Sequence, residues 1–261
     1  MTRTLWLAGL TAALCTLTGC GSADYLLPAG SQPGSAQVAA DQQAVDQRYN
    51  AVQFNLERAI TTEESALVKD PDWADGYSRL AQLFWDANEP AAALAEAHRA
   101  CDLAPHSAVD WNNLGQMAFS MHRWATAESA YKASLEQNPA GWQADVGLGQ
   151  LDLARHHPIA AQSEAQAALA SGGPQGPIYA LYGQIEQNSG NWNAAASYYR
   201  NAIAANPQWW QGYYDMGVVD VHWGEISEAE SNIRQALHDS PQSAAPWMLL
   251  QSLPQTISAQ P

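Results

Sequence analysis

Charged side chains are scarce in this sequence, and basic ones are the scarcest. Lysine, arginine, aspartate and glutamate make up 14% of the 261 residues, against about a quarter in an average soluble protein. Eleven basic residues stand against 26 acidic ones, which leaves a formal net charge of −15. Such a chain repels phosphate backbones and anionic headgroups. The composition therefore argues against nucleic acid and favours a neutral or basic partner.

Motifs of catalysis and of metal or nucleotide binding are also missing. The sequence contains no H-E-x-x-H, no paired-cysteine motif, no G-x-S-x-G and no P-loop. The adjacent His156 and His157 are the one tempting metal pair, but we expect them on a solvent-exposed turn. We therefore predict that the protein is not an enzyme and has no catalytic residue, metal ligand or cofactor.

Long hydrophobic runs are lacking as well. The apolar-rich stretch from Leu5 to Leu17 follows Arg3 and is too short to span a bilayer. A positive start, a short apolar core and small residues at its end are typical of a secretory signal. We interpret residues 1–19 as such a signal.

The signal ends in the sequence Leu-Thr-Gly-Cys, with the cysteine at Cys20. This ending resembles the lipobox of bacterial lipoproteins, which implies that Cys20 carries the lipid and becomes the first residue of the mature chain. An ordinary secretory signal with an accidental cysteine is the alternative. Gly21, where an aspartate would favour retention at the inner membrane, implies an outer-membrane location facing the periplasm by the same resemblance. Residues 20–36 are rich in Gly, Ser, Pro and Ala and predict a flexible tether.

Cysteine is otherwise almost absent. Cys15 lies in the predicted signal and Cys20 at its end, so that Cys101 is alone in the rest of the chain. A disulfide within the mature chain is thereby excluded. Cys101 stands at a position that other parts of the sequence fill with Leu or Ile, and we expect a buried, inert thiol.

A repeat is present, and proline marks it. Proline recurs at intervals of 34 residues or twice that spacing, at Pro71, Pro105, Pro139, Pro207 and Pro241. The missing mark is Gly173, with Pro174 beside it. Three columns of small residues share this period, and helices that cross closely need small residues at the crossing. When each repeat is counted from residue 74, 108, 142, 176 or 210, the eighth, twentieth and twenty-seventh positions hold only Ala, Gly or Ser.

Four segments carry a known pattern at this period. WNNLGQMA from Trp111 and YALYGQIE from Tyr179 resemble the first half of the tetratricopeptide repeat (TPR), and AESAYKASLEQNP from Ala127 and AASYYRNAIAANP from Ala195 resemble the second half. The resemblance implies an all-α fold, a right-handed α-solenoid of tandem 34-residue helix-turn-helix units. Five repeats are then expected, over residues 74–107, 108–141, 142–175, 176–209 and 210–243.

The turns and ends of the solenoid can be placed in this register. Gly190 and Gly224 stand at the fifteenth position, where a tight turn calls for left-handed backbone, and Asn88, His122 and His156 occupy it elsewhere. Residues 37–73 are expected to form a degenerate N-terminal repeat or one long helix. Residues 244–261 are expected to form a C-terminal capping helix and a tail.

The resemblance also implies a concave binding groove, formed by positions 2, 5, 9, 12 and 13 of each repeat. The ninth position holds a glutamine ladder, Gln82, Gln116, Gln150 and Gln184. The twelfth makes the N-terminal end of the groove apolar, with Trp85, Phe119 and Leu153. Side-chain amides both donate and accept hydrogen bonds, which suits a peptide backbone. Alternatively, glutamine is simply abundant on these helix surfaces.

A second set of polar residues stands at the eleventh position, where the family usually has tyrosine. This acidic column consists of Asp152, Glu186 and Asp220. The three acids either flank the groove and attract a basic peptide or are solvated surface charges.

Together these features predict a membrane-anchored periplasmic scaffold or adaptor that binds a peptide or helix in its groove. It resembles the TPR lipoproteins that act as pilotins or assist the assembly of pilus, secretion or cell-wall machinery. The alternative is a glycan-binding accessory subunit or regulator of a cell-wall or polysaccharide enzyme. Its sugar-stacking residues would be Trp209, Trp210 and Trp223.

Overall fold

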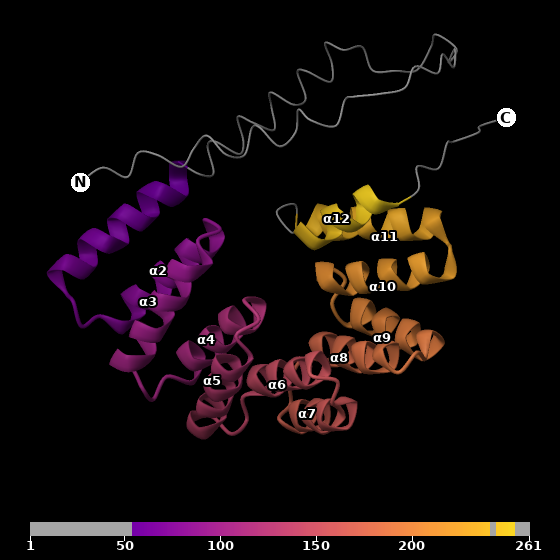
Figure 1. The fold of residues 1–261 in the computed structure, drawn as a ribbon, viewed down its shortest axis with the longest axis horizontal. Helices are drawn as coiled ribbons and strands as arrows, with labels where there is room; N and C mark the ends of the chain where they lie inside the picture. Colours follow the sequence, from indigo (N-terminus) through magenta and orange to yellow (C-terminus); the bar gives the residue numbers. More distant parts are fainter. Residues whose placement is uncertain (1–53, 241–243, 254–261) are drawn as a thin grey trace, which may run out of the picture. The chain divides into compact units, whose positions relative to one another are not determined.

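A computed structural model describes residues 54–240 and 244–253 of the chain, all within one compact unit, Gln53–Pro261. Every regular element in this part is an α-helix (Figure 1). A helical segment over residues 54–69 comes first. The helices that follow are α2 (Ala74–Asp86), α3 (Pro90–Leu103), α4 (Ala108–Ser120), α5 (Trp124–Gln137), α6 (Trp142–Ala154), α7 (Pro158–Ala170), α8 (Gln175–Asn188), α9 (Trp192–Ala205), α10 (Trp210–Trp223), α11 (Ile226–Asp239) and α12 (Ala244–Ser252).

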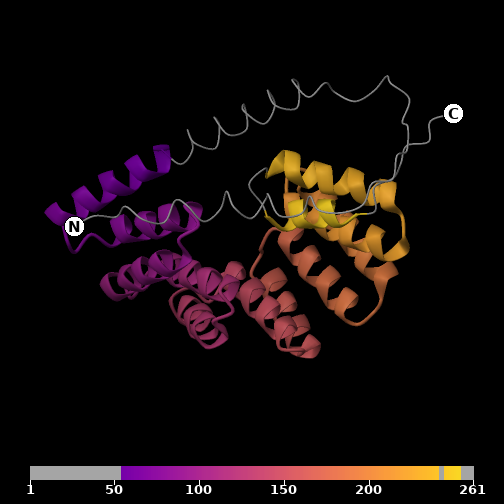
Figure 2. The same ribbon diagram turned by 45° about the horizontal axis from the view of Figure 1, so that its top comes forward.

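The helices pair in sequence order, one pair in each 34-residue range. The most extensive packing joins α2 to α3, α4 to α5, α6 to α7, α8 to α9 and α10 to α11. Each second helix then packs on the first helix of the next pair (Figures 1 and 2). This arrangement confirms the predicted all-α solenoid of helical hairpins. In the described residues, no helix is long and apolar enough to cross a bilayer.

The turn inside each hairpin has the predicted left-handed residue. The fifteenth position has φ between 57° and 79° in all five pairs, at Asn88, His122, His156, Gly190 and Gly224. Glycine adopts this conformation freely, whereas a residue with a Cβ is strained by about 1–2 kcal/mol. At His122, the imidazole lies edge-on to Trp124, with ring centroids 4.9 Å apart.

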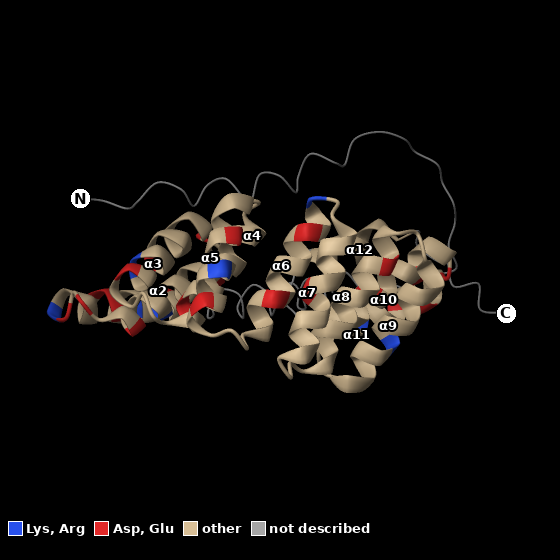
Figure 3. Cartoon of the chain, turned by 90° about the horizontal axis from the view of Figure 1, so that it is seen from below, with Lys and Arg blue, Asp and Glu red and all other residues tan. Residues whose placement is uncertain are grey.

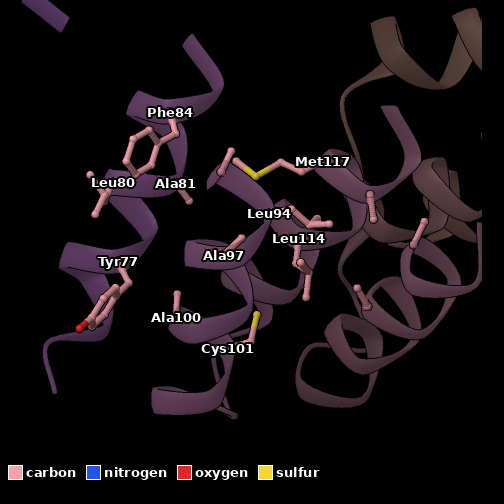
Figure 4. Close-up of a cluster of buried hydrophobic side chains, with 14 of the residues drawn as sticks. Tyr77, Leu80, Ala81, Phe84, Leu94, Ala97, Ala100, Cys101, Leu114 and Met117 are labelled. Carbon is pink, nitrogen blue, oxygen red and sulfur yellow. The ribbon is translucent and has the colours of Figure 1, made fainter. Parts of the chain in front are cut away.

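The columns of small residues lie where paired helices cross. The twentieth position is an alanine in every repeat, and all five alanines are 0% exposed. Opposite them, large side chains fill the core, as Figure 4 shows for α2, α3 and α4 around Leu80, Leu94 and Leu114. Cys101 belongs to this cluster and is 1% exposed, and burial raises the pKa of its thiol to about 12. The predicted burial of this thiol is therefore confirmed.

The break in the proline spacing has a steric cause. Helix α7 ends at Ala170, and Gly172 turns the chain with a φ of 74°. A Cβ on the next residue, Gly173, would lie 2.7 Å from Cβ and Cγ of Trp142 and 3.1 Å from the carbonyl oxygen of Ala168. The backbone thus passes against the start of its own repeat, where glycine fits and a larger residue does not.

The two ends of the described fold are covered by single helices. In the segment 54–69, Ile60 and Leu67 are buried in the same cluster as the α2 core, and Glu63 pairs with Arg79 at 3.1 Å. At the other end, α12 packs on α11 through Leu249 and Leu250. Residues 37–53, which decide between a hairpin and a long helix, lie outside the described residues, as do the signal, Cys20 and the tether.

Candidate functional site

The first helices of neighbouring pairs also contact one another. Helix α4 contacts α6, α6 contacts α8, and α8 contacts α10. These helices carry the predicted groove positions. Acidic residues are distributed along the solenoid, basic ones are few, and uncharged residues make up most of its ribbon (Figure 3). The candidate site is therefore the face made by the first helices.

Two residues of the glutamine ladder, Gln82 and Gln116, line one cavity between the first two repeats. The cavity has a volume of about 150 Å³ and is lined by Gln82, Trp85, Asn113, Gln116, Met117 and Ser120. Gln82, Trp85 and Gln116 were predicted for the groove by name, and Ser120 stands at its thirteenth position. Asn113 and Met117 stand at the sixth and tenth positions of their repeat and were not. This volume is about that of one medium-sized side chain. We call this cavity the notch.

Several oxygen atoms at and beside the notch can accept a hydrogen bond. The Gln82 side-chain nitrogen donates to Asp86 Oδ1 at 2.8 Å, which leaves the Gln82 Oε1 free to accept. Ser120 Oγ is committed to the carbonyl of Gln116 at 3.0 Å. At the neighbouring fifth position, Oδ1 of Asn112 is buried without a hydrogen-bond partner. A partner that offers N–H groups would meet these needs, because a buried unpaired acceptor is costly.

The other predicted groove residues are placed differently. Trp85 and Phe119 are half-buried, and the Phe119 ring lies 5.4 Å from that of Trp124. Leu153 is 6% exposed and belongs to a core cluster with Ala161 of its own repeat and Ile178 of the fourth. Gln150 is half-buried on α6. Of the three apolar residues predicted for the groove, Leu153 is therefore buried in the core, whereas Trp85 and Phe119 remain partly exposed.

A second polar cluster lies between α8 and α10. The Asp215 carboxyl is enclosed there, and burial raises its pKa to about 7, although hydrogen bonding from the Gln184 amide opposes the shift. Oδ2 of Asp215 and Oε1 of Gln211 are both buried and have no partner. Of this cluster, sequence reasoning found Gln184. A signal for the acid was available in its neighbours, since Asp215 stands between Tyr214 and Met216 in α10.

Comparison with known proteins identifies the fold. Residues 176–208 match the family model described as tetratricopeptide repeat. The chain is similar to a thermophilic TPR protein of Thermus thermophilus, with 16% identity and a TM-score of 0.61 over 69% of this chain and 97% of that one. The fold is a TPR solenoid.

Two further solved chains show how widely the fold is shared. PilW, a widely conserved type IV pilus biogenesis factor, is 16% identical with a TM-score of 0.54, over 67% of this chain and 82% of that one. A chain of the APC/C hetero-tetramer Cut9–Hcn1 is 16% identical with a TM-score of 0.60, over 76% of this chain and 39% of that one. No curated protein sequence matches significantly. At such identities, the likeness concerns the fold alone.

Within the TPR register, the acidic column lies beside the turn of each hairpin. Asp152 Oδ1 is 3.8 Å from His157 Nδ1, and Glu186 accepts a hydrogen bond from Asn191 Nδ2 at 2.8 Å. Asp220 is 1% exposed and accepts a hydrogen bond from Asn232 Nδ2 at 2.7 Å. Each acid thus binds a polar residue of its own repeat. Asp152 and Glu186 remain partly exposed, whereas Asp220 is neither a solvated charge nor open to a partner.

The three tryptophans of the glycan alternative are all half-buried in the TPR packing. Trp209 lies against the backbone of Gly176 and Gly212, and Trp210 lies 6.3 Å from Tyr214 between ring centroids. Trp223 packs on the cluster around Tyr199. In the described part of the chain, no group of three or more His, Cys, Asp or Glu residues is arranged to hold a metal ion.

Proposed function

We propose that this protein is a membrane-anchored periplasmic scaffold or adaptor, and that it assists the assembly of an envelope machine such as a pilus, secretion or cell-wall system. In this proposal the groove captures an extended or helical segment of a protein partner. The lipid at Cys20 raises the partner's local concentration at the outer membrane. Support comes from the TPR fold, the lipobox-like ending of the signal, and the likeness of PilW.

The notch is the observation that carries the binding part of the proposal. It brings Gln82, Gln116 and Trp85 from two repeats around one space of about 150 Å³. Amides beside an aromatic wall suit one side chain of a peptide together with its backbone N–H groups. We favour this function over glycan binding because Trp209, Trp210 and Trp223 are each half-buried in helix packing.

Loss of the groove amides is expected to weaken partner binding about tenfold. The partner is first captured by a photo-reactive residue at Gln116 in the full chain in its native envelope, and its affinity is then measured with purified protein. The double variant Gln82→Ala, Gln116→Ala removes the amides of the notch. The matched control, Gln162→Ala with Gln166→Ala, removes two exposed glutamines from the second helix α7. Equal capture from Gln166, or equal weakening by the control, would rule out the groove as the binding site.

The location is tested separately through Cys20. The Cys20→Ala variant is expected to lose a metabolic fatty-acid label and to move from the membrane to the soluble fraction, because the sulfur that accepts the lipid is gone. The measurement compares label and fractionation of the two forms. A label that persists on the variant, or an unlabelled parent protein that still sediments with membranes, contradicts the anchor.

A further inference from the structure

The enclosed carboxyl group of Asp215 stands out from the other acids of the fold. Its Oδ2 and the Oε1 of Gln211, one helical turn earlier on α10, are buried acceptors without a donor. In the described part of the chain, no lysine, arginine or histidine nitrogen lies within 4 Å of this carboxylate. Both Asp215 and the buried Asp220 accept a hydrogen bond from one amide, Gln184 or Asn232, but among the described residues only Asp215 keeps a carboxylate oxygen that is buried and unpaired. A buried acceptor without a donor and a buried acid without a positive partner each cost folding free energy. A ligand that supplies a hydrogen-bond donor here would remove that cost.

The surrounding groups do not meet this need. From α8, the Gln184 amide hydrogen-bonds to the carboxyl group. From α9, the Tyr199 hydroxyl is committed to Gln187 Oε1 at 2.7 Å. From α10 itself, burial raises the pKa of the Tyr214 phenol, and the nearby charge of Asp215 adds to the shift. These neighbours comprise one donor already in use and two phenols, and none carries positive charge.

We propose that this cluster, which we call the Asp215 site, receives the ammonium group of a lysine side chain of the protein partner. The inference rests on the proposed function and specifies the chemistry of the partner at the groove between repeats 4 and 5. An ammonium carries three N–H donors on a thin, flexible stem and would serve both unpaired oxygens with charge-assisted bonds. The excess of acid over base in the chain attracts such a partner before contact.

In this proposal a lysine reaches the site by displacing the Gln211 side chain. In the described residues, its amide has no hydrogen-bond partner, so rotation about its side-chain bonds breaks none. Asp215 and Gln211 are each half-buried as residues, and only their terminal oxygens are fully covered. The partly exposed stems of both residues are therefore where the proposed lysine would approach Oδ2 of Asp215.

The test uses the full lipidated chain in detergent and three rhodamine-labelled, end-capped nonapeptides of alanine and serine. Their central residue is lysine, arginine or norleucine, and binding is followed by fluorescence anisotropy. The lysine peptide is expected to bind at least about tenfold more tightly than the norleucine peptide. Asp215→Asn is expected to abolish that preference, whereas the charge-matched control Asp102→Asn, on an exposed site of α3, keeps it. Gln211→Leu, which leaves the carboxylate in place, is expected to weaken the lysine peptide as well.

The pH dependence of binding gives a second readout. With a pKa of about 7, Asp215 becomes ionised as the pH rises through neutrality, while lysine stays charged. The lysine preference should therefore grow from about pH 6 to about pH 8 in the parent protein and be absent from Asp215→Asn.

The outcomes separate this site from the groove function. Equal binding of the lysine and norleucine peptides, a preference that survives Asp215→Asn, or no binding by any peptide overturns the lysine site and indicates that water alone fills it. A stronger preference for arginine overturns the choice of an ammonium. The groove function is judged apart from these results, by capture at Gln116 and by the glutamine double variants.

Discussion

Replacing Gly183 with alanine is expected to destabilise the protein by about 2 kcal/mol, after allowance for the helix propensity that alanine adds. A Cβ at this position of α8 would lie 2.4 Å from Cε1 and 2.7 Å from Cδ1 of Tyr199. That ring is 0% exposed, and its hydroxyl is bound to Gln187, so it cannot swing aside without breaking a hydrogen bond. The added methyl group must therefore separate α8 from α9, which share the most extensive packing in the fold.

The same helix provides the control. A Cβ on Gly176 would find its nearest atom, Cβ of Asn206, at 3.5 Å, which is ordinary contact. Gly176→Ala should therefore be neutral or stabilise the protein by up to about 1 kcal/mol, because alanine is the better helix former. Urea unfolding of both variants, followed by tryptophan fluorescence, measures the difference. A similar effect of the two substitutions would show that propensity, and not the close approach to Tyr199, governs the eighth position.

The periodic features of this fold were predictable because each is repeated. Small residues recur where helices cross, as at Ala195 and Gly183, and a left-handed residue recurs at each turn. A column of five similar residues is a much stronger signal than any one of them. The large side chains that fill the space beside these small residues were less predictable. The Tyr131 ring, for example, lies within 3 Å of a Cβ built on either Gly115 or Gly147, which belong to different repeats.

Features that occur once were the ones that sequence reasoning missed. The acidic column was noticed because three acids were in register, yet its members bind polar groups of their own repeats. Asp145 is a single departure from the repeat pattern, whereas Asp215 stands at the sixth position, where the five repeats share no residue type. Asp145 is 4% exposed at the fourth position, where four other repeats carry an aromatic ring, and Ser171 Oγ lies 3.5 Å from its carboxylate. An acid that replaces a core aromatic residue was the available signal of a buried charge.

Burial of Asp215 is expected to make the protein less stable as the pH rises from acid to neutral. Desolvation raises the pKa of this carboxyl group to about 7, from an ordinary value of 3.8, and hydrogen bonding from Gln184 offsets only part of the shift. The folded state then holds a proton that the unfolded state has released, and stability must fall with pH between the two values. Between about pH 5 and about pH 8, the loss from this one group is roughly 2.5 kcal/mol.

Asp215→Asn removes this titration while it keeps the size of the side chain. The variant should therefore gain stability over the parent protein as the pH rises, with a difference that grows by roughly 2.5 kcal/mol from about pH 5 to about pH 8. Other buried acids with raised pKa values, such as Asp145 and Asp220, are present in both proteins and cancel in the comparison. Asp102→Asn, at an exposed position, should show no such growth. Urea unfolding at each pH measures the difference, and a difference independent of pH would mean that the folded protein keeps Asp215 ionised and already supplies it with a donor.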